Sequence, residues 1–173
     1  SGTLLDTARL RARLAEYLSV SQKNVHAYVF GEHGDTAFVP WSSAQISSAS
    51  LDEYAEIMKK AGRPVAPLDK DAMVEYVHKS GGEIISNKGA TFYAVSISVC
   101  RLCSVLLSAY NSITTVSTLM HGEYGIDDVC LSTLNMIGPN GVQGKLPIKL
   151  TDEELKKIQA SADNLKETMK QIN

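Results

Sequence analysis

Apolar residues recur every three or four positions near both ends of the chain, which is the spacing of one face of an α-helix. Residues 4–18 carry one apolar seam at Leu10, Leu14 and Leu18 and a second at Leu5, Ala8, Ala12 and Ala15. Residues 151–172 carry apolar positions at Leu155, Ile158, Ala162, Leu165, Met169 and Ile172. Thr3 with Asp6, and Thr151 with Glu154, have the spacing of a capping box. The pattern therefore predicts a capped helix at each end.

Three further helices are predicted in the middle of the chain, over residues 51–61, 69–86 and 91–109. The last of them is apolar on almost every side, which is typical of a central and largely buried helix. It contains Cys100 and Cys103, which we interpret as packing residues because no second cysteine pair accompanies them.

β-Branched and aromatic residues predict strands over residues 25–30, 113–120, 129–137 and 142–150. The sequence Gly-Pro-Asn-Gly at 138–141 has the chemistry of a hairpin turn between the last two. Successive strands with helices grouped around them indicate an α+β fold, an antiparallel strand meander packed with long helices. Because no repeat, low-complexity stretch or internal linker interrupts the chain, we expect one domain.

Composition narrows the possible partners and the cellular compartment. The chain has 173 residues, 17 Lys+Arg and 19 Asp+Glu, and this net charge of −2 argues against a nucleic-acid or anionic-membrane surface. No apolar run approaches the ~20 residues of a membrane span. The cysteines, which number 3, are too few for a disulfide framework and favour a cytoplasmic location. Ser1-Gly2-Thr3 leads directly into a helix without an initiating Met, so we expect a piece of a longer protein, cut at a domain boundary.

His33 is the first candidate for chemistry. It stands between Gly31 and Gly34, so the backbone can turn sharply after the predicted strand and leave the imidazole accessible. An accessible histidine is a candidate general acid–base because its pKa can lie near the working pH. The alternative is a loop histidine that makes local hydrogen bonds.

Asp6 and Arg9 are separated by three residues and project from one side of the first helix. A carboxylate can orient an imidazole, and a guanidinium can bind a substrate carboxylate through two parallel hydrogen bonds. The alternatives are a capping acid and a solvated helix charge. Arg11, two residues beyond Arg9, points about 200° away from it and must serve another purpose.

Other motifs of cofactor binding are missing from the sequence. There is neither G-x-G-x-x-G after a strand nor G-x-x-x-x-G-K-[ST], so a dinucleotide or phosphate loop of the usual kinds is not expected in this chain. A metal site would have to gather His33, Asp35, His121 and Glu123 from separate loops, and we predict none. His78 is expected to be a solvated residue on a charged helix face.

Taken together, Ser-Gly-Thr-Leu-Leu-Asp-Thr-Ala-Arg at 1–9 and Gly-Glu-His-Gly-Asp-Thr at 31–36 resemble the L-lactate/malate dehydrogenase family. The bacterial lactate branch is the most similar. Lys-Gly-Ala-Thr-Phe-Tyr-Ala at 88–94 resembles the family's helix beside the substrate pocket. The likeness extends over essentially all residues, 1–173, and corresponds to the C-terminal, substrate-binding domain of such enzymes.

The resemblance implies a role for each candidate residue. His33 would donate a proton to the pyruvate carbonyl, Asp6 would orient it, and Arg9 would bind the substrate carboxylate. Thr91 would line the pocket near substrate and nicotinamide. NAD would be bound mainly by an N-terminal dinucleotide-binding domain that this chain lacks, so the chain alone would not turn over substrate.

The resemblance also bears on specificity and regulation. Glu32 favours lactate over malate, whereas Gly81 and Gly82 could leave room for other 2-oxo acids. Arg11 and His26 match positions at which some bacterial relatives bind fructose bisphosphate across the subunit interface of a homo-oligomer, a homotetramer. The alternatives are a malate or other L-2-hydroxy-acid dehydrogenase, a non-catalytic oligomerisation or effector-binding module, and a metal-dependent hydrolase that uses His33 and His121.

Overall fold

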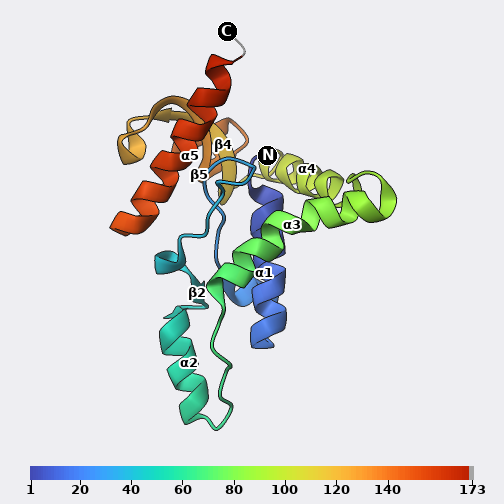
Figure 1. Cartoon of the computed structure of the whole chain (residues 1–173), viewed down its shortest axis with the longest axis vertical. Coiled ribbons are helices and arrows are strands. Elements are labelled where there is room, and N and C mark those ends of the chain that lie inside the picture. Colours follow the sequence, from blue (N-terminus) through green and yellow to red (C-terminus); the bar gives the residue numbers. More distant parts are fainter. Residues whose placement is uncertain (172–173) are drawn as a thin grey trace.

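The structure, a computed structural model, describes residues 1–171 and contains helices on several sides of two antiparallel sheets (Figure 1). The helices are α1 (Leu4–Leu18), α2 (Leu51–Lys60), α3 (Lys70–Lys88), α4 (Tyr93–Leu106) and α5 (Asp152–Lys170). The small sheet joins β1 (Val25–His26), β2 (Gln45–Ile46) and β3 (Ala49–Ser50), and the large sheet joins β4 (Ser112–His121), β5 (Asp127–Gly138) and β6 (Gly141–Lys145). The predicted α+β class is confirmed. Ile172, predicted on the closing helix, lies outside the described residues.

The large sheet is the predicted meander. β4 pairs with β5 from Ser112 opposite Ile137 to His121 opposite Asp127, and the hairpin closes where Gly138 faces Gly141. β6 is shorter than the predicted strand 142–150, since its ladder ends at Lys145. Pro147 follows soon after and lacks the N–H that a ladder would need.

Helix α5 packs against the large sheet, and it runs beside β4 and β5 in Figure 1. The capping box predicted at its start is confirmed, because Thr151 accepts from the Glu154 N–H and Glu154 accepts from the Thr151 N–H. Ile158 and Ala162 are buried in a core that includes Phe30, Phe38 and Leu131 from the opposing elements. α5 is therefore fixed in register against the sheet.

Helix α1 forms a second core with α3 and with the segment that follows α1 in the chain. Its leucine seam at 10, 14 and 18 is buried as predicted, together with Met73 and Val77 of α3. The alanine seam is only partly buried, because Ala8 and Ala12 are exposed.

The predicted strand 25–30 is mostly not a strand. β1 ends at His26, and beyond it hydrogen bonds from side chains of α1 and of its N-cap residue Thr3 replace the ladder. Thr3 Oγ1 donates to the Val29 carbonyl, Thr7 Oγ1 accepts from the Val29 N–H, and Arg11 Nε donates to the Ala27 carbonyl. These side chains satisfy the backbone groups that a neighbouring strand would otherwise take.

The expectation that helix 91–109 is central and buried is wrong. α4 and the end of α3 together reach outward from the sheets in Figure 1, and Tyr93 and Ile97 are each 70% exposed. Cys100 and Cys103 are exposed too, so they do not pack in a core here. An all-round apolar pattern measures the character of a helix and not whether another element of the same chain covers it. None of the helices in residues 1–171 combines the length and apolar character that a membrane crossing requires.

Truncation of Ile158 should test the importance of α5 packing. We expect Ile158→Ala to lower the free energy of unfolding by roughly 2–5 kcal/mol, because the side chain is fully buried and leaves a cavity. Met169→Ala, on an exposed side chain of the same helix, should change it by less than ~0.5 kcal/mol. Urea unfolding followed by circular dichroism measures both, and equal losses would contradict the packing described.

Candidate active site

His33 lies in the loop that follows residues 27–30, and its side chain is 60% exposed. Nδ1 is 2.6 Å from Asp6 Oδ2. Because a carboxylate accepts, Nδ1 carries the proton in this contact and Nε2 is left to exchange a proton with a ligand. The interpretation of His33 as a loop residue with purely local contacts is therefore wrong, because its partner lies 27 positions away on α1.

Asp6 is buried in the first turn of α1, with 7% of its side chain exposed. The predicted capping box with Thr3 is wrong: Thr3 makes no side-chain cap and donates to Val29 instead. Asp6 is consequently free of the helix end and bonds to His33 and Arg9.

The pKa of His33 is raised above its ordinary value of 6.5. The hydrogen bond to Asp6 is the largest cause, while partial burial and the positive charge of Arg9 act in the opposite direction. Near neutral pH a larger share of His33 is thus protonated than for a free histidine, which suits a proton donor.

Arg9 projects from the same side of α1, with 14% of its side chain exposed. Its Nη1 is 3.4 Å from Asp6 Oδ1, a long and single contact. Since a guanidinium has five N–H donors in a fixed plane, this contact leaves donors for a ligand carboxylate.

A pocket of about 360 Å³ brings the candidate residues together. Asp6, Arg9, His33 and Thr91 line it, with α3 forming the opposite wall through Gly81, Gly82 and Ile85. Thr91 lies between α3 and α4 and is exposed. The pocket places an acid–base group, a carboxylate-binding cation and a hydroxyl around one volume.

Sequence reasoning missed the place of His78. Instead of being merely solvated, it borders the same pocket from α3 and its Nε2 is 3.0 Å from the Ala37 carbonyl. The sequence holds a signal for this, because His78 directly follows the apolar Val77 and precedes Gly81 by three residues, which puts it at the edge of an apolar helix face.

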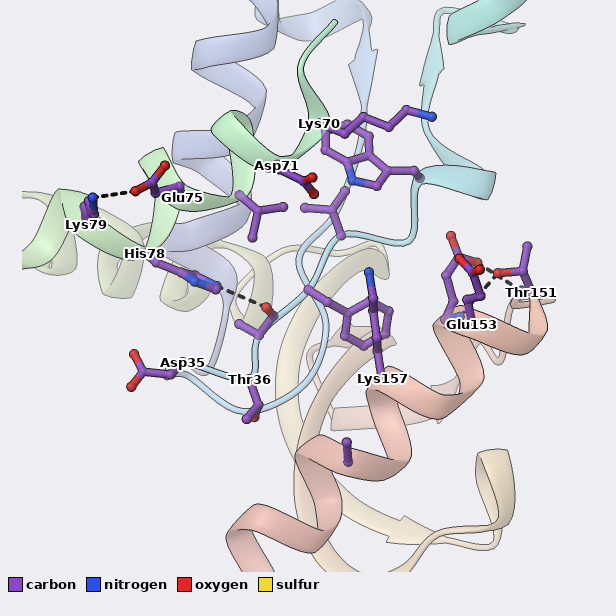
Figure 2. Close-up of a pocket in the computed structure, with 17 residues that line it drawn as sticks. Asp35, Thr36, Lys70, Asp71, Glu75, His78, Lys79, Thr151, Glu153 and Lys157 are labelled. Atoms are coloured by element: carbon purple, nitrogen blue, oxygen red, sulfur yellow. Dashed lines mark hydrogen bonds and ion pairs between the residues drawn. The ribbon is translucent and has the colours of Figure 1, made fainter.

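A larger groove of about 880 Å³ adjoins this pocket between α3, the segment 35–41 and the start of α5 (Figure 2). Asp35, Ala37 and His78 line both volumes. Lys70 of α3 and Lys157 of α5 line the groove. Since acidic side chains from the same helices lie among them, the groove has no uniform charge.

Arg11 faces a different part of the molecule, as its helical position predicts. Its guanidinium lies 4.7 Å from the centre of the Tyr28 ring and contributes to a pocket of about 310 Å³ with Lys23 and Arg101. His26 is part-buried on β1, next to the Ala27 carbonyl that Arg11 binds, but it does not line that pocket. Within one chain the two residues are neighbours without sharing a cavity.

A metal centre finds no support in residues 1–171, where no group of three or more His, Cys, Asp or Glu side chains is arranged to hold an ion. Glu123 is instead engaged by Lys145 at 3.0 Å and by the main-chain N–H of His121.

Removing the charge of Asp6 should lower the pKa of His33. The folded-state value lies above the unfolded one, so the pair stabilises the fold at pH below the unfolded pKa, and this is lost as pH rises through the folded pKa. Asp6→Asn should therefore cost more stability at pH 5 than at pH 8. An NMR titration of His33 and unfolding at both pH values measure this. Glu16→Gln, which lacks contact with His33, is the control, and an unchanged His33 pKa in Asp6→Asn would contradict the pairing.

Comparisons with known proteins show the family of the chain. Residues 3–173 match the family model described as lactate/malate dehydrogenase, alpha/beta C-terminal domain. The L-lactate dehydrogenases of Acetivibrio thermocellus and Thermoanaerobacterium saccharolyticum are 41% and 40% identical over 173 residues, all of this chain and 54% and 55% of theirs.

Solved structures show the same fold. The L-lactate dehydrogenase from Clostridium thermocellum gives a TM-score of 0.88 at 37% identity, covering 99% of this chain and 55% of that one. A lactate dehydrogenase from a deep-sea metagenome library gives 0.91 at 31%, covering 98% and 53%. The chain spans about half the length of the curated relatives it matches. The chain belongs to the lactate/malate dehydrogenase family and corresponds to the C-terminal domain of that family.

Proposed function

We propose that residues 1–173 are the substrate-binding and catalytic domain of an NAD-dependent L-lactate dehydrogenase, which interconverts pyruvate plus NADH and L-lactate plus NAD. The observation that carries this proposal is the pocket in which the His33–Asp6 pair stands beside Arg9. The names of the relatives support pyruvate and lactate over other substrate pairs.

In this mechanism Arg9 holds the substrate carboxylate and so presents the 2-oxo group to His33. NADH, when bound, supplies the hydride that adds to the carbonyl carbon. Negative charge then develops on the carbonyl oxygen, and His33 Nε2 donates its proton there. Asp6 stabilises the imidazolium before transfer and keeps Nδ1 protonated afterwards. In the reverse direction neutral His33 removes the hydroxyl proton from lactate.

The nicotinamide cofactor requires a second domain in this proposal. The chain contains no glycine-rich dinucleotide loop, and nearly half of each relative's length lies outside the match. We assign cofactor binding to that part, with Thr91 at the boundary near the nicotinamide. The active protein is a homo-oligomer in the cytoplasm, and residues 1–173 alone do not turn over substrate.

The α3 wall favours a second candidate, a dehydrogenase for bulkier L-2-hydroxy acids. A Cβ built on Gly81 or Gly82 would meet no atom within 4 Å, so the pocket is open on that side. Glu32, which the family resemblance links to lactate, directs its carboxylate to Thr36 and Asn164 and does not line the pocket. Selection between substrates is therefore assigned to the α3 wall and to the other domain.

We further propose fructose bisphosphate as an effector, bound by Arg11 and His26 where two subunits meet. Arg9 serves the active-site pocket and Arg11 a different one, so the two cations are independent. A twofold interface doubles each cation, which suits a ligand with two phosphates.

Oxidation of NADH by the full-length protein, with pyruvate, oxaloacetate and a bulkier 2-oxo acid compared, tests the proposed activity. We expect fastest turnover with pyruvate, and His33→Gln should lower kcat by ~10²–10⁴-fold because the proton donor is lost. His121→Gln, outside the pocket, is the matched control. Preference for another 2-oxo acid would change only the assigned substrate. No oxidation of NADH with any of the three acids would refute the proposed function.

Substitution of Arg11 tests the effector site separately. Arg11→Gln should abolish stimulation by fructose bisphosphate; because the variant also loses the hydrogen bond to the Ala27 carbonyl, stimulation is measured relative to its own unstimulated rate. Steady-state rates across a range of effector concentrations provide the measurement. Stimulation that survives in Arg11→Gln would eliminate this site.

A further inference from the structure

Polar side chains hold the histidine loop, residues 31–36, against α5. The Glu32 N–H donates to Ser161 Oγ at 2.9 Å, and Thr36 Oγ1 lies 2.9 Å from the same oxygen. The Glu32 carboxylate accepts from Thr36 Oγ1 at 2.6 Å and from Asn164 Nδ2 at 3.0 Å. Ser161 is fully buried, so the contacts to its hydroxyl are sheltered from water, whereas Asn164 is exposed.

Thr36 Oγ1 is the donor toward both of its partners, the Glu32 carboxylate at 2.6 Å and Ser161 Oγ at 2.9 Å. A hydroxyl has one proton and a carboxylate accepts only, so Thr36 shares its proton between the two acceptors. Ser161 Oγ also accepts from the Glu32 N–H. These contacts form a closed ring in which Ser161 is the member that comes from outside the loop.

The backbone at Gly31 also rests on Ser161. Its φ is +97°, and a Cβ built there would lie 2.8 Å from Ser161 Oγ. Only glycine permits both this conformation and this approach. The loop thus contacts Ser161 through the main chain of two successive residues as well as through Thr36.

Ser161 is itself held at a fixed point. Ile158, one turn before it, and Ala162, directly after it, are buried in the core against the large sheet. The capping box at Thr151 fixes the start of the same helix. A small movement of the loop relative to α5 would therefore break the ring instead of carrying Ser161 along.

The side chain of His33 depends on its backbone for position, because it is largely exposed and bonded to Asp6. Besides Asp6, the charged or titratable groups that line its pocket are Arg9 of α1, Asp35 of its own loop and His78 of α3. We infer that Ser161 is a positioning residue: with Asn164 it anchors Glu32, and the anchored loop aims His33 Nδ1 at Asp6. The catalytic consequence rests on the proposed function, whereas the positioning itself does not.

The pKa of His33, measured by NMR in the 173-residue chain, tests this inference. Ser161→Ala should shift it down toward the ordinary value, because a displaced loop weakens the bond to Asp6. Adding Asp6→Asn to Ser161→Ala should lower it less than Asp6→Asn does in the wild-type background, since both act on one contact. Ser80→Ala, which removes a buried hydroxyl bonded within α3, should leave the pKa of His33 unchanged.

Asn164→Ala keeps the inference testable if Ser161→Ala does not fold, because Asn164 is exposed. It should produce a smaller downward shift, since the Ser161 ring remains. A wild-type His33 pKa in every folded variant would overturn the inference, as would an equal shift in Ser80→Ala. Both results are pKa values measured without substrate. They therefore test the positioning role of Ser161 separately from the proposed lactate dehydrogenase activity.

Discussion

The hydrogen bonds between α1 side chains and the backbone of residues 27–29 determine where Asp6 and His33 meet. Thr7 binds the Val29 N–H at 3.0 Å, and Arg11 binds the Ala27 carbonyl at 3.0 Å. Each bond contributes about 0.5–1.5 kcal/mol, but loss of one partner leaves a buried polar group that costs more. Asp6 immediately precedes Thr7, and His33 follows Val29 by four residues. The 2.6 Å contact between Asp6 and His33 is thus a consequence of how α1 is docked.

The histidine loop needs support from three elements because it contains two glycines. Gly31 and Gly34 permit its sharp path, but their freedom in the unfolded chain makes the loop costly to order. A main-chain bridge from Gly31 to Ser132 of β5 holds one side, and the Ser161 ring on α5 holds the other. With Asp6 of α1 as the third contact, the loop is ordered without burying His33, which leaves Nε2 accessible to a substrate.

The sequence predicts those parts of the fold that depend on local periodicity. α1, α3, α5, β4 and β5 agree closely with their expected ranges, whereas β6 is shorter than expected, and Asp6, Arg9, His33 and Thr91 line one pocket. The errors occur where a distant group decides the outcome. Residues 27–29 have strand composition but bond to α1 side chains, and α4 has a core composition but stays uncovered in this chain. No local pattern contains that information.

Helix geometry explains how α1 can serve two different sites. Successive residues turn by 100°, so Arg9 stays on the side of Asp6 while Arg11 lies about 200° further round. Arg9 consequently lines the pocket of His33, whereas Arg11 lies against the Tyr28 ring. Because Arg11 also anchors the Ala27 carbonyl, any ligand that draws its guanidinium away must disturb the docking of α1. A signal at Arg11 would therefore reach Asp6 through less than two turns of one helix, which provides a physical route between the proposed effector site and His33.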